Sequence, residues 1–107
     1  MQVFFVLLYL IMHRINLNDQ LSFTIEQGEK RLRLIVLNGD EELVCHKATQ
    51  AELQQFIKAD KSHLFKGRLQ LDKTGAHIGI SVKNKTAGAI HLKEFQNLID
   101  SAIPINI

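Results

Sequence analysis

The two halves of this sequence follow one plan, in which short alternating strands lead into an amphipathic helix. The matching strand positions are Leu32, Leu34, Val36 and Asn38 in the first half and Ile78, Ile80, Val82 and Asn84 in the second. The matching helix positions are Glu52, Leu53, Gln54, Phe56 and Ile57, and then Glu94, Phe95, Gln96, Leu98 and Ile99. This pattern predicts two βββα repeats, at about residues 19–60 and 64–103. Chance similarity between two amphipathic units is the alternative.

Such a chain is expected to fold as one α+β domain. An antiparallel sheet of about six strands would bury Leu32, Leu34 and Val36 on the same face as Ile78, Ile80 and Val82, with both helices packed there by a pseudo-two-fold. Asn38-Gly39 is a strong hairpin-turn signal. Thr49 and Glu52 form a capping-box pattern that predicts the start of the first helix. The second helix is expected to begin near His91, and residues 60–65 read as a polar linker.

Length and cysteine content limit the class of protein. The chain has 107 residues, of which 46% are apolar, so one domain over residues 12–107 can fill a modest core. A single cysteine, Cys45, excludes an internal disulfide framework and favours a reducing, cytoplasmic location. A buried strand position is the ordinary interpretation of Cys45, since the sequence gives it neither a neighbouring base nor a reason for a lowered pKa.

Residues 1–11 stand apart because they are wholly apolar except for Gln2 and the phenol of Tyr9. As a helix they would reach only about 16 Å, roughly half of a bilayer core. The positive charge and the small residues of a signal peptide are also missing. Three interpretations remain: a buried first element, an upstream extension with Met12 as the natural start, and, as the weakest, membrane attachment.

The sheet face opposite the predicted core carries mostly polar and basic side chains. They are Arg31, Arg33, Arg68, Gln70, His77, Ser81 and Lys83. Arg and Lys neutralise phosphate and release counterions, so this face favours binding to the nucleic-acid backbone. The expected contacts are Arg31, Arg33, Lys66, Arg68 and Lys83. Trp is absent and the Phe residues fall on predicted core positions, so the aromatic rings needed for base stacking are missing, and a simple solvated face is the alternative.

Ile35 and Leu37 interrupt that polar face. Two apolar side chains beside Arg31 and Arg33 predict partial cover, either by the N-terminal segment or by a second subunit. A homodimeric protein-interaction module using Ile35, Leu37, Phe4 and Phe5 is therefore the alternative function.

No set of residues in the sequence indicates catalysis, a metal or a cofactor. The five histidines, His13, His46, His63, His77 and His91, lack the spacing that metal sites favour. The glycines are scattered through turns and strands, so no phosphate loop is present. The acidic turn Asp40-Glu41-Glu42 lacks the spaced oxygen ligands of a calcium loop. We therefore expect a non-enzymatic protein without metal or cofactor.

Overall fold

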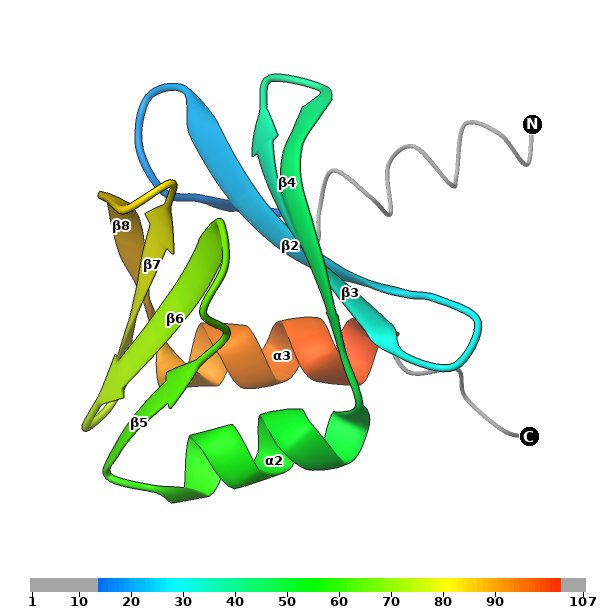
Figure 1. Cartoon of the computed structure of the whole chain (residues 1–107), viewed down its shortest axis with the longest axis vertical. Helices are drawn as coiled ribbons and strands as arrows, with labels where there is room; N and C mark the ends of the chain where they lie inside the picture. Colours follow the sequence, from blue (N-terminus) through cyan, green and yellow to red (C-terminus); the bar gives the residue numbers. More distant parts are fainter. Residues whose placement is uncertain (1–13, 103–107) are drawn as a thin grey trace.

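The computed structural model describes residues 14–102, which form eight strands and two helices (Figure 1). The first half contains β1 (Ile15–Asn16), β2 (Leu21–Gln27), β3 (Leu32–Asn38), β4 (Glu41–Ala48) and α2 (Gln50–Lys58). The second half contains β5 (Lys61–Leu64), β6 (Leu69–Thr74), β7 (His77–Val82), β8 (Lys85–His91) and α3 (Leu92–Ala102). The α+β class and the antiparallel pairing expected from the sequence are confirmed.

The strands form two four-stranded antiparallel sheets, β1-β2-β3-β4 and β5-β6-β7-β8, instead of one sheet of about six strands. The prediction of a single sheet was wrong in this respect. The chain enters α2 directly after β4, and β5 then pairs with β6. β5 lies in the segment that was predicted to be a polar linker. The sequence did not indicate a strand there because Lys61, Ser62 and His63 give it little apolar alternation. Each half thus carries four strands before its helix, in place of the predicted three.

Tight hairpins set the register of both sheets. Asn38 pairs with Glu41 around Gly39, whose φ of 62° is the left-handed conformation that glycine adopts without steric cost. In the second sheet Val82 pairs with Lys85, and both intervening residues, Lys83 and Asn84, have positive φ. Positive φ at both central positions is the type I′ geometry, which suits the right-handed twist of the strands.

The two sheets and the two helices share one core. The six strand residues expected to face it, Leu32, Leu34, Val36, Ile78, Ile80 and Val82, are all buried. At its centre the ring of Phe95 in α3 stacks on Phe23 of β2 at 6.2 Å and meets Phe56 of α2 edge-on at 5.9 Å. α3 therefore packs on a strand of the other half, and the two helices lie side by side (Figure 1).

Both helices start with local side-chain caps. The Thr49 hydroxyl accepts from the Glu52 amide at 3.1 Å, and the Glu52 carboxylate accepts from the Thr49 amide at 3.1 Å, which confirms the predicted capping box. At α3 the His91 ring nitrogen accepts from the Lys93 amide, and Glu94 accepts from the His91 amide. His91 has the helix-start role expected of it.

Residues 1–13 and 103–107 lie outside the described part of the chain, and with them lie Phe4, Phe5, the apolar segment 1–11 and His13. Within residues 14–102, neither helix has the length and apolar character that a membrane span requires.

A candidate nucleic-acid interface

Four basic side chains gather where β2 turns into β3. Lys30 and Arg31 lie in the loop before β3, and Arg33 on β3 pairs across the sheet with Lys47 on β4. Together with Gly28 and Glu29 these residues line a shallow concave surface. We call Lys30, Arg31, Arg33 and Lys47 the loop cluster.

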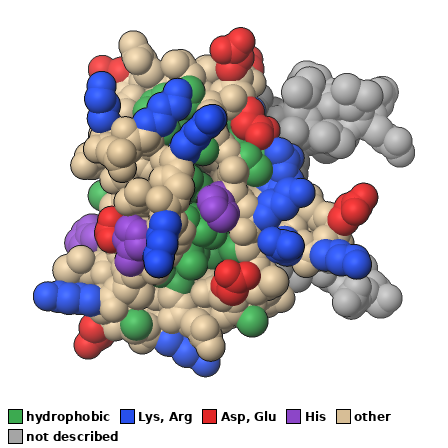
Figure 2. Space-filling model, viewed as in Figure 1, with side chains coloured by type: hydrophobic (Ala, Val, Ile, Leu, Met, Phe, Trp, Pro, Cys, Tyr) green, Lys and Arg blue, Asp and Glu red, His purple; other side chains and the backbone are tan. Residues whose placement is uncertain are grey.

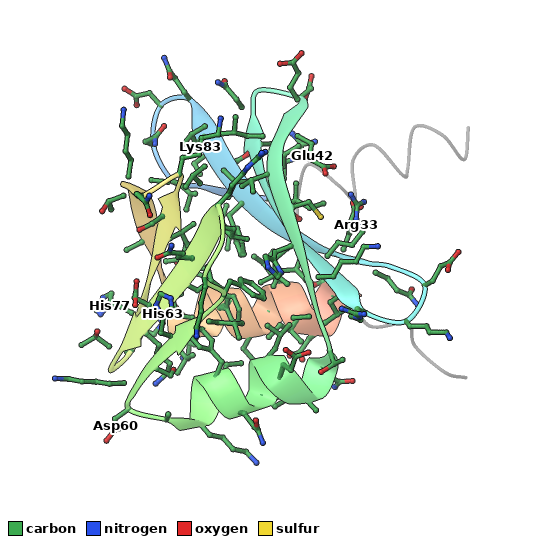
Figure 3. The ribbon with its side chains drawn as sticks, in the orientation of Figure 1. Arg33, Glu42, Asp60, His63, His77 and Lys83 are labelled. Carbon is green, nitrogen blue, oxygen red and sulfur yellow. The ribbon has the colours of Figure 1, made fainter. Side chains whose placement is uncertain are left out.

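Arg33 is the one member of this cluster held by carboxylates in the described structure. Its guanidinium donates to Glu26 of β2 and to Glu42 of β4, the latter at 3.1 Å (Figure 3). Burial lowers the pKa of Arg33, but its contacts with Cys45, Glu26 and Glu42 outweigh burial and raise the pKa above its ordinary value. Arg33 therefore ties three strands together and has less capacity to bind phosphate than its exposed neighbours.

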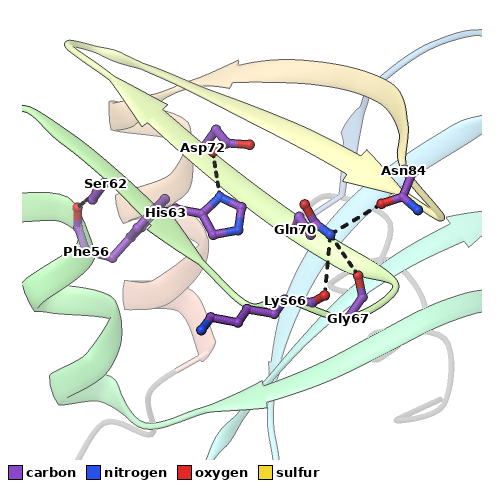
Figure 4. A network of polar contacts seen from close by, with 8 residues as sticks. All are labelled: Phe56, Ser62, His63, Lys66, Gly67, Gln70, Asp72 and Asn84. Carbon is purple, nitrogen blue, oxygen red and sulfur yellow. Dashed lines mark hydrogen bonds and ion pairs between the residues drawn. The ribbon is translucent and has the colours of Figure 1, made fainter.

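A second basic group, the corner cluster, consists of Lys66, Arg68 and Lys83 at one end of the second sheet. The Lys83 amide donates to the Arg68 carbonyl at 2.7 Å, so the β7–β8 turn lies against the start of β6. The Gln70 side-chain amide donates to the carbonyl of Gly67 at 3.1 Å and lies 3.5 Å from both the Lys66 carbonyl and the Asn84 side-chain oxygen (Figure 4). These bonds fix the backbone that carries the three cations.

An aromatic contact joins the edges of the two sheets that carry these clusters. The His46 ring on β4 stacks on the Phe65 ring at 3.8 Å, with 19° between the ring planes. The stack joins the edges of the two sheets, with the His46 ring on the Leu34 side of β4 and Lys47 on the opposite, Arg33 side. Figure 2 shows Lys and Arg side chains on either side of a strip of histidine and apolar side chains on the viewed face.

Phe65 itself has a φ of 72°, which is rare for a bulky residue. The His46 contact and this conformation were missed by sequence reasoning, because Phe65 falls at the end of a polar segment without a periodic pattern. A cross-sheet contact between residues nineteen positions apart, 46 and 65, leaves no local signal.

A charged pair on the second sheet lies close to the corner cluster. The His63 ring nitrogen on β5 lies 2.6 Å from the Asp72 carboxylate on β6 (Figure 4). The hydrogen bond to Asp72 is the main cause that raises the pKa of His63, while partial burial and the nearby Lys66 charge oppose it. His63 is thus more often protonated than an ordinary histidine at neutral pH.

The five predicted phosphate contacts do not share one sheet face. Arg31 lies in the loop before β3 and Arg33 on β3 of the first sheet, whereas Lys66, Arg68 and Lys83 belong to loops and a turn of the second. The expectation of a single face followed from the expectation of a single sheet, and it was wrong for the same reason. Lys30 and Lys47 were not among the predicted contacts, although they complete the loop cluster.

The two described residues that were predicted to contact a protein partner lie on β3 and are buried. Ile35 and Leu37 are buried on the outer side of β3, at 3% and 8% exposure. Cys45 is partly buried and pairs across the sheet with Ile35. Within residues 14–102, no group of three or more His, Cys, Asp or Glu side chains is arranged to hold a metal ion.

Comparison of the chain with protein-family models, with curated proteins and with solved structures finds no match.

Proposed function

We propose that this protein is a small non-enzymatic module that binds the phosphate backbone of nucleic acid through the loop and corner clusters. The observation that carries the proposal is the gathering of exposed cations on both sheets, on either side of the strip that Figure 2 shows, while the His46–Phe65 stack joins the two sheets. A row of phosphates is a repeating anion, and a binding surface for it needs several cations held at separated points.

The cations of these clusters are exposed. The side chains of Arg31, Lys47, Lys66, Arg68 and Lys83 all lie at the surface. The four ion pairs found among residues 14–102 use Arg14, Arg33 and His63 as their cations and none of these five. An exposed cation without a carboxylate at hydrogen-bond distance keeps its full charge for an external anion.

The alternative, a homodimeric protein-interaction module, has less support. It needs an exposed apolar face, and the two described residues that would form it, Ile35 and Leu37, are buried within the single chain. We therefore place nucleic-acid binding first.

Charge reversal tests the proposal. Arg31→Glu with Lys47→Glu alters the loop cluster, and Lys66→Glu with Lys83→Glu alters the corner cluster. Each double variant should weaken binding to fluorescent single- or double-stranded oligonucleotides roughly tenfold or more at low salt. The matched control is Lys58→Glu with Lys93→Glu, which makes the same change of net charge on exposed positions of α2 and α3.

The control should retain most of the affinity. Equal weakening by all three double variants would show that net charge alone governs binding, and the absence of binding by the unaltered protein at low salt would refute the proposal.

A further inference from the structure

The outer side of the first sheet carries side chains that point away from the core. Thr24, Ile35 and Cys45 lie in one cross-strand row over β2, β3 and β4, and Ser22 pairs with Leu37 in the next row. We call these five residues the outer patch. Ser22, Thr24, Ile35 and Leu37 are only 7%, 6%, 3% and 8% exposed, although Ile35 and Leu37 are not part of the core cluster.

The matching side of the second sheet is different. Its side chains are Gln70, Asp72, His77 and Ser81, which are polar and partly or fully exposed. A sheet face in contact with water normally carries residues of this kind. The small, uncharged outer patch of the first sheet instead has the composition of a face that packs against another part of a protein.

The chain enters the described structure beside this patch. Ile15 pairs with Phe23 and packs on the core, so its neighbour Arg14 directs its side chain to the outer side. The Arg14 guanidinium reaches the Asp40 carboxylate at 3.3 Å and the Gly39 carbonyl at 3.5 Å, at the β3–β4 turn. Arg14, the first described residue, therefore lies at the edge of the outer patch.

We propose that the apolar segment of residues 1–11 covers the outer patch of its own chain. The segment is almost wholly apolar, and only Met12 and His13 separate it from Arg14. Three strands span about 10 Å, and eleven residues reach about 16 Å as a helix and further as a strand, so the segment is long enough in either conformation. Burying it there removes a hydrophobic surface that would otherwise contact water.

A second copy of the chain fits the patch less well. Five side chains offer far less than the roughly 800 Å² per partner that stable protein interfaces bury. The rim also carries the ion pairs of Arg33 with Glu26 and Glu42, which a flat apolar partner would have to desolvate.

The single cysteine provides the test, because Cys45 lies within the patch. In the unaltered protein, a maleimide should label Cys45 slowly. Replacing four segment residues together, Phe4→Ser, Phe5→Ser, Leu7→Ser and Leu8→Ser, should accelerate labelling roughly tenfold or more as the cover opens. The matched control carries Cys45→Ser and Ser81→Cys, which moves the thiol to the outer side of β7. Its labelling rate should be the same with and without the four serine substitutions.

Unchanged Cys45 labelling in the serine variant would overturn the proposal. So would a Cys45 rate that falls as the protein concentration rises, since that result assigns the cover to a second copy.

A second measurement applies if the serine variant does not fold. Single cysteines introduced in turn at positions 3 to 8 are exposed to oxidised glutathione, which accepts the two electrons and two protons that a new disulfide releases. At least one should form an intramolecular disulfide with Cys45. Formation of none, or of bonds between chains only, would also overturn the proposal.

Discussion

Gly88 on β8 shows how closely single residues bring the two sheets together. A β-carbon at this position would lie 2.7 Å from the Leu17 carbonyl oxygen, which belongs to the loop after β1. The Asn18 side chain adds a bond from the same loop to the Ala87 carbonyl, at 2.9 Å. The backbone of the first half therefore approaches β8 so closely that only glycine, which has no side chain, fits at position 88.

Gly88→Ala should lower the free energy of unfolding by about 1–3 kcal/mol, because the backbone carbonyl opposite cannot move aside as a side chain could. Chemical denaturation measures the change. Gly67→Ala is the matched control, since a β-carbon there meets no atom within 4 Å, and it should stay within about 0.5 kcal/mol of the unaltered protein. Equal effects of the two substitutions would contradict the contact.

The His63–Asp72 pair gives a second prediction for a single residue. Because the folded-state pKa of His63 is raised above its unfolded value, the stability that the pair contributes is present in acid and is lost as the pH rises through the folded-state pKa. Asp72→Asn should bring the His63 pKa down towards its ordinary value, which an NMR titration of the imidazole can follow. Asp60→Asn removes a carboxylate without touching this hydrogen bond and should leave the titration unchanged.

At the scale of the elements, the contact of α3 with β2 should make the two halves of the chain fold together. It packs on β2 of the first half as well as on β7 and β8 of its own. Phe95 is fully buried at the meeting point of α3, β2 and α2.

Phe95→Ala should therefore destabilise the whole domain, by about 3–5 kcal/mol, through lost apolar burial and the cavity it leaves. Hydrogen exchange should show lost protection in β2 as well as in α3. Phe65→Ala, at a partly buried phenylalanine, should cost clearly less. If the protection of β2 survives Phe95→Ala, the two halves unfold independently and the shared core is refuted.

The elements that the sequence predicted well are those with strong local patterns. Alternation located β2 and β3, the Thr49 capping box located the start of α2, and helical spacing located α3. β1 and β5 were missed because the first has two residues and the second has little apolar alternation. Local chemistry identifies elements whose side chains alternate between core and water and misses those that do not.

At the scale of the whole molecule, the arrangement of the strands in sheets could not be predicted from the sequence. β4 could pair with a strand of the second half or form the edge of a sheet. Contacts between distant residues decide between the two, because β4 shows the same alternation of apolar and polar side chains in both cases. Because the strands form two sheets, the predicted phosphate contacts lie in two separate clusters. The contact of His46 with Phe65, between residues far apart in the sequence, is one of the contacts that join the two sheets.

The central claim is that the loop and corner clusters bind phosphate, and a salt titration tests it most directly. The affinity for a fluorescent oligonucleotide is measured in steps from about 50 mM to about 200 mM salt. The two clusters supply six exposed cations, which are Lys30, Arg31, Lys47, Lys66, Arg68 and Lys83. With six cations, the logarithm of the affinity should fall linearly with the logarithm of the salt concentration, with a slope of up to about 4–5 in magnitude. Charge reversal within either cluster should reduce that slope. A slope near zero, or no binding at the lowest salt, would contradict the account.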